Sequence, residues 1–84
     1  MEVLEVVNTK GKDGRTFGQR HRYLRRQGGW SIREETRHTH VASSTIVAWE
    51  HDRRKPEAGP QARAVARFFR VSVGWLLDGE PPMD

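Results

Sequence analysis

The apolar residues of the chain are patterned rather than sparse, and from Phe17 onward residue types that start and stop helices divide the pattern into five segments. Two capping boxes, each a Ser or Thr followed three residues later by Glu or Gln, mark the first two helix starts: Thr16 with Gln19, and Ser31 with Glu34. The first helix is predicted to run to about Gln27, before Gly28-Gly29, and the second to about Thr39.

A third helix is predicted to begin at Ser43, because Ser can cap a helix while Ala42 cannot, and to run through Glu50. Ile46 and Trp49 lie three positions apart on this segment, at the spacing of a buried helix face. We therefore expect both side chains in the core, which leaves the other face of this helix outward.

Two further segments complete the pattern, of which the last is short. A fourth helix is predicted to start at Gly59-Pro60, with Pro at the first helical position, where its missing N–H is tolerated. The last helix is capped by Ser72 and ended by Gly79. The remaining large apolar residues expected in the core are Trp30, Val65, Ala66, Phe69, Trp75, Leu76 and Leu77.

Residues 1–16 differ from the rest of the chain. Val3 to Val7 are rich in β-forming residues, Asn8 to Gly14 is turn material, and Arg15 to Phe17 is a candidate second strand. An isolated hairpin is marginal in water, so three arrangements stay open: packing on the helical body, pairing with a second copy, or a mobile arm. The predicted organisation is an arm or hairpin at 1–16, one helical domain at 17–79 and a tail at 80–84.

Composition narrows the classes of protein. A chain of 84 residues has room for one small domain, for which an all-α bundle is the expected architecture. Lys and Arg outnumber Asp and Glu by 15 to 11, a net charge of +4, which favours a polyanionic partner. The absence of Cys excludes disulfides and fits a reducing cytoplasm. No apolar run reaches the ~18 residues of a membrane span, so no membrane partner is expected.

Catalytic motifs are missing from the sequence. There is no glycine-rich phosphate loop between a strand and a helix, and no acid pair or Ser/His/Asp set that a helical frame would bring together. His38 and His40 face different sides of a helix, which argues against a zinc site. The prediction is a protein that is not an enzyme and has neither metal nor cofactor.

Three stretches of the chain carry a family resemblance, in register and without gaps: FGQRHRYLRRQGGWS, VASSTIVAWEHDRRKP and VARFFRVSVGWLLDGE. Residues 17–79 resemble the Cro/repressor type of helix-turn-helix DNA-binding domain, the XRE family that includes phage repressors. The resemblance implies a five-helix fold and a sequence-specific transcriptional regulator of double-stranded DNA, most plausibly a phage or mobile-element repressor that binds its operator in a bacterial cytoplasm.

The resemblance also implies that the helix from about Ser43 to His51 lies in the major groove, which admits one α-helix. By position, Ser43, Ser44 and Ala48 face the bases, with Thr45 and Val47 beside them. These side chains are small and lack the bidentate pairing of Arg or Gln, so specificity is expected to depend partly on DNA shape and on apolar contacts.

Phosphate contacts are expected at two places. One is the basic loop that follows the recognition helix, whose side chains neutralise the DNA backbone without reading sequence. The other is the start of the second helix, where unpaired N–H groups attract anions, although the family's usual Gln is replaced there by Ile32. The residues assigned to phosphate are Arg25, Ser31, Arg33, His51, Arg53, Arg54 and Lys55.

Arg25 and Glu50 match a pair that bridges the first helix and the recognition helix in this family. The Arg is expected to bind the carboxylate through two nitrogens, which fixes the angle of the recognition helix and leaves it able to reach a phosphate as well.

The second helix departs most from the family. Glu35, Thr36, Thr39 and His40 stand where the family has Leu, Ala, Leu and Gly, and His21 replaces a Leu on the first helix. Two arrangements would accommodate these polar groups, which must be paired if buried. One is an internal network such as His21 with Glu35, and the other is a shifted helix that leaves this face in water.

A single recognition helix contacts few base pairs, so we expect two copies on an inverted repeat. Either the final helix around Val73 and Leu77 or the Val3 to Val7 segment is expected to join the copies. The alternative function is an interaction protein, such as a toxin-neutralising antitoxin or a recombination accessory factor, that uses the same domain to hold a protein partner.

Overall fold

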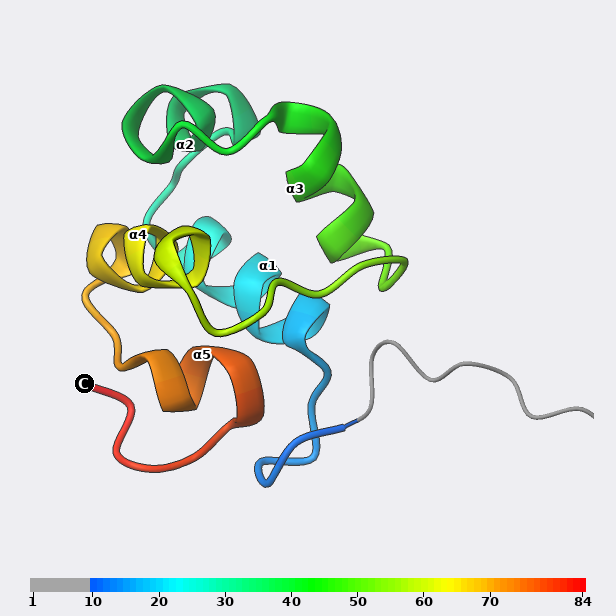
Figure 1. Cartoon of the computed structure of the whole chain (residues 1–84), viewed down its shortest axis with the longest axis vertical. Coiled ribbons are helices and arrows are strands. Elements are labelled where there is room, and N and C mark those ends of the chain that lie inside the picture. Colours follow the sequence, from blue (N-terminus) through cyan, green and yellow to red (C-terminus); the bar gives the residue numbers. More distant parts are fainter. Residues whose placement is uncertain (1–9) are drawn as a thin grey trace, which may run out of the picture.

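Five helices and their connections make up residues 10–84, the part of the chain that the computed structural model describes (Figure 1). No strand occurs within these residues, so the prediction of an all-α fold with five helices is confirmed. The predicted strand Val3 to Val7 lies outside the described residues. The helices are α1 (Phe17–Gln27), α2 (Ile32–Thr39), α3 (Ser43–Glu50), α4 (Pro60–Phe69) and α5 (Val73–Asp78).

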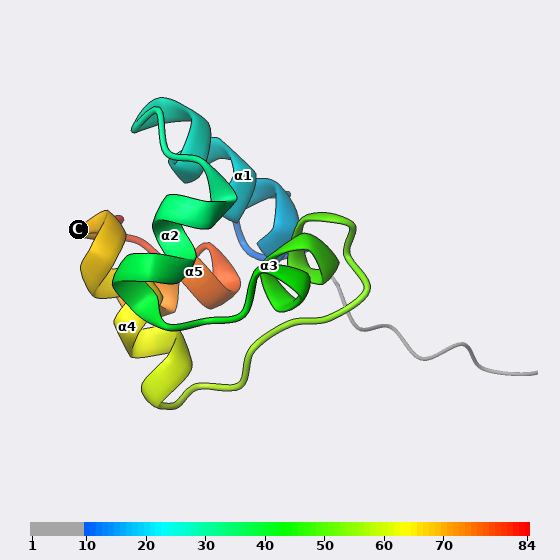
Figure 2. The same ribbon diagram turned by 90° about the horizontal axis from the view of Figure 1, so that it is seen from above.

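The helices surround one core, to which every helix contributes. α1 packs against α3 and α5, α2 packs against α3 and α4, and α4 packs against α5. Phe17, Ile46 and Trp49 are at most 1% exposed, and the ring of Phe17 meets that of Trp49 edge to face at 5.3 Å. Each such side chain contributes roughly 1.5–3 kcal/mol by leaving water. α3 thus has a firmly anchored inner face. It lies at the upper right edge of the molecule in Figure 1, and in Figure 2 the loop that follows it passes around it.

Local capping residues set most of the helix ends. Both predicted capping boxes form: the Thr16 hydroxyl accepts from the Gln19 N–H, and the Ser31 hydroxyl accepts from the Glu34 N–H, with the reciprocal bonds also present. Pro60 opens α4 and Ser72 caps α5, as the sequence predicts. These bonds satisfy amides that a helix start otherwise leaves without partners.

The start of α3 differs from the prediction. Its residue range is as expected, but the N-cap is Ala42, which supplies no side-chain hydrogen bond, and Ser43 is the first helical residue. The Ala42 carbonyl accepts from Thr45 and Ile46, while the Ser43 hydroxyl lies 2.9 Å from that of Thr36. Burial of Val41 in the core, where it is 2% exposed, holds the backbone in place of a cap.

Arg15 to Phe17 do not form the second strand of a hairpin. Thr16 is the N-cap of α1, and Phe17 is already the first residue of that helix and fully buried. The preceding turn is tied to the other end of the chain, since the Lys12 N–H donates to the Asp78 carbonyl at 2.8 Å. Packing against α5 therefore replaces strand pairing in this part of the N-terminal segment.

Arg20 joins this turn to α1 and α5. Its side chain is fully buried, and Nε and Nη2 donate to the carbonyls of Leu76 and Leu77 at 2.9 and 2.8 Å. Nη1 donates to Asp13 and to the Arg15 carbonyl, both at 2.7 Å. The buried charge is therefore neutralised, and the last carbonyls of α5 receive the donors that a helix end lacks.

Two residues expected in the core, Trp30 and Phe69, are half-buried, and Leu77 is buried as expected, which argues against its other expected role in joining two copies. Trp30 is half-buried rather than in the core, because the side chains it packs on, Phe68 and the exposed His38, themselves lie near the surface. Leu77 is 7% exposed and belongs to the core of its own chain, so it offers no apolar surface to a second copy. Val73 is half-buried.

Candidate nucleic-acid interface

α2 and α3 are joined by a short turn at residues 40–42. His40 ends α2 in the left-handed region, at φ 64°, where its N–H donates to the Thr36 carbonyl. Thr39 is buried, and its hydroxyl donates to the Glu35 carbonyl and accepts from the Val41 N–H. The polar residues of the turn therefore bond to the backbone, and α3 leaves the turn in a defined direction.

The outer face of α3 carries small side chains. Ser43, Ser44 and Val47 are exposed, whereas Thr45 and Ala48 are half-buried toward the flanks. All five belong to the base-facing set expected from the sequence, and the buried residues Ile46, Trp49 and Glu50 lie on the inner face. The Ser43 hydroxyl is hydrogen-bonded to the Thr36 hydroxyl. Of the two serines, Ser44 therefore has the hydroxyl that is more available for a further hydrogen bond.

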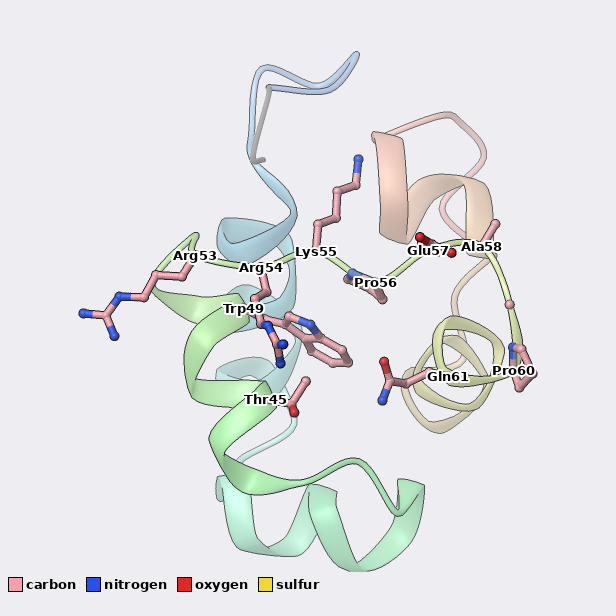
Figure 3. A pocket seen from close by; sticks show the side chains of 11 residues that line it. Thr45, Trp49, Arg53, Arg54, Lys55, Pro56, Glu57, Ala58, Pro60 and Gln61 are labelled. Carbon is pink, nitrogen blue, oxygen red and sulfur yellow. The ribbon is translucent and has the colours of Figure 1, made fainter. Parts of the chain in front are cut away.

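The three basic residues after α3 do not form one patch. Figure 3 shows Arg53, Arg54 and Lys55 projecting in different directions, with Arg54 directed toward Thr45. Lys55 is half-buried, and its Nζ lies 3.3 Å from the Asp78 carboxylate of α5. Lys55 is thus drawn away from α3, so Arg53 and Arg54 are the exposed cations of the expected phosphate loop.

An open groove of about 720 Å³ separates α3 from the start of α4 (Figure 3). Thr45 and Trp49 line one side and Gln61 and Pro60 the other, and Figure 3 shows Arg54 beside Thr45 and Trp49. The N-cap of α4 is Gly59, which provides no side-chain bond to the first amides of the helix. The positive end of the α4 dipole and Arg54 both favour an anion in this groove, whereas the Glu57 carboxylate, which also lines it, opposes one. The sequence predicted this helix start at Gly59-Pro60 but not its place beside Arg54, which depends on how the loop at residues 51–59 folds.

The start of α2 is less open to a phosphate than expected. The Glu34 carboxylate accepts the Ser31 N–H at 2.8 Å, and the Ser31 hydroxyl accepts the Glu34 N–H at 3.0 Å. The hydrogen bond from the Ser31 backbone lowers the pKa of Glu34, so its negative charge lies where an anion would bind. Arg33 is exposed and lies next to this carboxylate in the chain.

Arg25 and Glu50 lie together behind α3. Arg25 Nε and Nη2 donate to the two Glu50 oxygens at 2.7 and 2.8 Å, and Nη1 donates to the Trp30 carbonyl at 3.1 Å. The hydrogen bond to Glu50 raises the pKa of Arg25. All three guanidinium nitrogens are thus engaged within the protein, and the side chain is 17% exposed. This arrangement fits a positioning role better than a phosphate contact.

His21 extends the Arg25–Glu50 pair into a buried network. Its Nδ1 lies 2.7 Å from Glu50, and its Nε2 lies 2.7 Å from Glu35 on α2. Of the two arrangements that the sequence left open for α2, the structure has the internal network. Burial alone would raise the pKa of Glu50, but hydrogen bonds from Arg25 and His21 outweigh it and hold the pKa well below its usual range.

His51, the remaining predicted phosphate residue, follows the last turn of α3. Its ring is exposed, with Nδ1 3.0 Å from the Val47 carbonyl. The exposed residues at the end of α3 and just after it thus include Val47, His51 and Arg53.

Within residues 10–84, no three His, Asp or Glu side chains are arranged to hold a metal ion, and no helix is long and apolar enough to cross a bilayer. Comparison of the chain with protein-family models, with curated proteins and with solved structures finds no match. Functional inference for this chain therefore depends on its own residues and their geometry.

Proposed function

We propose that the chain is a sequence-specific double-stranded DNA-binding transcriptional regulator that places the outer face of α3 in the major groove. The main observation behind this proposal is that the two faces of α3 differ. The inner face is buried and ion-paired, while the outer face exposes small side chains. A helix of this kind is able to approach base edges closely without losing its position in the protein. The turn at residues 40–42 makes α2 and α3 a helix-turn-helix unit in this proposal.

Charged groups on either side of α3 support the proposal. Arg53, Arg54 and the groove toward α4 lie after the helix, and Arg33 lies near the start of α2. Exposed cations that precede and follow α3 in the chain are suited to phosphates of the DNA backbone on which α3 would lie. The net charge of +4 adds a general attraction to DNA.

A homodimer on an inverted repeat, with half-sites about 10 bp apart centre to centre, is part of the proposal, because one short helix reads few base pairs. We propose that it acts in the cytoplasm as a repressor of phage or mobile-element type. Burial of Leu77 removes that residue from the dimer contact, which leaves Val73 and residues 1–14 as the segments to test by deletion or substitution.

Selection of bound sequences from a random DNA pool tests this function. We expect an enriched inverted repeat, and a changed base preference for Ala48→Gln, because Gln pairs bidentately with adenine and discriminates by about 1–3 kcal/mol at one base pair. Gln61→Ala, which alters the groove beside α3, is the matched control and is expected to leave the preferred sequence unchanged.

A selection without any enriched sequence would contradict the proposed function and favour the interaction-protein alternative. Enrichment that Ala48→Gln leaves unaltered in sequence and in affinity would show that this face of α3 does not enter the groove.

Arg54→Ala is expected to weaken binding to all DNA sequences alike and to reduce the slope of log K against log salt by about 0.9, the loss of one phosphate contact. Titrations at several salt concentrations measure the slope. Arg67→Ala removes the same charge from the exposed face near the end of α4 and is expected to change the slope less. A change in the preferred sequence at constant slope would be inconsistent with a backbone contact by Arg54.

A further inference from the structure

His21 is fully buried between two carboxylates on different helices. Its Nδ1 lies 2.7 Å from Oε2 of Glu50 on α3, and its Nε2 lies 2.7 Å from Oε2 of Glu35 on α2. A neutral imidazole donates from only one nitrogen and presents a lone pair at the other. Both contacts are donor bonds to carboxylates only when the ring is an imidazolium.

The two carboxylates depend on His21 to different degrees. Glu50 also binds Arg25 through both oxygens and lies 3.5 Å from Arg22, so its charge is neutralised without His21. Glu35 is fully buried, its Oε1 has no hydrogen-bond partner, and its Oε2 meets His21. Loss of one His21 proton would leave a neutral ring that donates to only one of the two carboxylates, so the Glu35 charge would lose its only hydrogen-bonded cation in the core, at a large desolvation cost.

Among residues 10–84, no other charged group contacts the ring to replace this proton. The side chains facing His21 are Glu35 from α2, Glu50 and the Trp49 ring from α3, the Phe69 ring from α4, and Phe17 from its own helix. The cations nearest to the cluster, Arg25 and Arg22, are bonded to Glu50 rather than to Glu35.

We propose that His21 is retained as an imidazolium in the folded chain and that this single proton clamps α2 and α3 onto α1, which makes the α2–α3 unit sensitive to pH. Burial alone would lower the pKa of His21, but the hydrogen bonds to Glu35 and Glu50 outweigh it and raise the pKa above 6.5. The stabilisation is therefore complete below the unfolded pKa and is lost as the pH rises through the folded pKa.

The first test is unfolding of the full chain by urea, without DNA, at a series of pH values. Above about pH 6.5 the folding equilibrium constant is expected to fall up to about tenfold per pH unit, the linkage of one proton, until the folded pKa is passed. Glu35→Gln removes the charge that needs the proton, and its pH dependence is expected to be flatter. His38→Gln removes an exposed His of α2 and is expected to retain the dependence. A flat profile for the unsubstituted chain would overturn the proposal.

A second measurement covers the case in which Glu35→Gln does not fold. Heteronuclear NMR of the unsubstituted protein near neutral pH is expected to show both ring nitrogens of His21 protonated. A ring with one unprotonated nitrogen would overturn the proposal. Neither measurement involves DNA, so each outcome is independent of the proposed function. If that function holds, DNA affinity is expected to fall over the pH range in which the clamp is lost.

Discussion

Arg20→Ala is expected to destabilise the folded chain by about 3–5 kcal/mol, the cost of removing one partner from a buried ion pair. The guanidinium is fully buried and donates to the carbonyls of Leu76 and Leu77 and to the Asp13 carboxylate. Without it, buried carbonyls lose their donors, each at roughly 1–3 kcal/mol, and α5 loses its link to α1. Urea unfolding of the two proteins measures the difference.

Arg26→Ala is the matched control for Arg20, because Arg26 lies on the same helix and is exposed. The Arg26→Ala substitution is expected to lower the free energy of unfolding by at most about 1 kcal/mol. Similar small losses for both variants would show that the Arg20 contacts with α5 do not hold the fold together. An Arg20→Ala chain that is already unfolded without urea agrees with the prediction.

Glu50→Ala is expected to destabilise the folded chain by about 3–5 kcal/mol. The substitution leaves two cations, Arg25 and His21, behind α3, and Glu35 is the one carboxylate of the network that remains. Urea unfolding of Glu50→Ala, Arg25→Ala and the double variant measures the coupling of the pair. A coupling near zero, with small additive losses, would contradict the view that this pair holds α3 against α1.

The Glu50 carboxylate also limits the stability of the fold at low pH. The pKa of Glu50 is lowered from 4.5 in the folded chain, so its stabilisation is complete above about pH 4.5 and is lost as the pH falls through the folded pKa. The raised pKa of His21 acts in the opposite direction, and its stabilisation is lost as the pH rises above about 6.5 through the folded pKa. These two groups together place the most stable range of the domain in mildly acidic solution.

The helix boundaries could be predicted because the interactions that set them are local. The Ser31–Glu34 box and the Thr16–Gln19 box each connect residues three positions apart, so both bonds are visible in the sequence. Helical periodicity likewise predicted that Ile46 and Trp49 lie inside, which makes the opposite face of α3 the outer one. At Ala42 this local reasoning gave the wrong cap, because the core around Val41 holds the turn instead.

The candidate site was predicted in part. The outward position of Ser44 and Val47 follows from periodicity, but the directions of Lys55 and Arg54 do not. Lys55 turns toward Asp78, a residue 23 positions away, because α5 packs beside the loop. The groove at the start of α4 likewise exists only once the fold places α3 on one side of it and the start of α4 on the other.

The sequence by itself determined the number and limits of the helices, their inner faces and the excess of positive charge, because capping, periodicity and composition are properties of neighbouring residues. Only the tertiary structure decided which polar groups are buried together. Arg20 meets carbonyls 56 and 57 positions away, and His21 meets Glu35 and Glu50 at separations of 14 and 29. The physical reason is that desolvation and ion pairing depend on which side chains the packed helices enclose, and sequence spacing does not specify that enclosure.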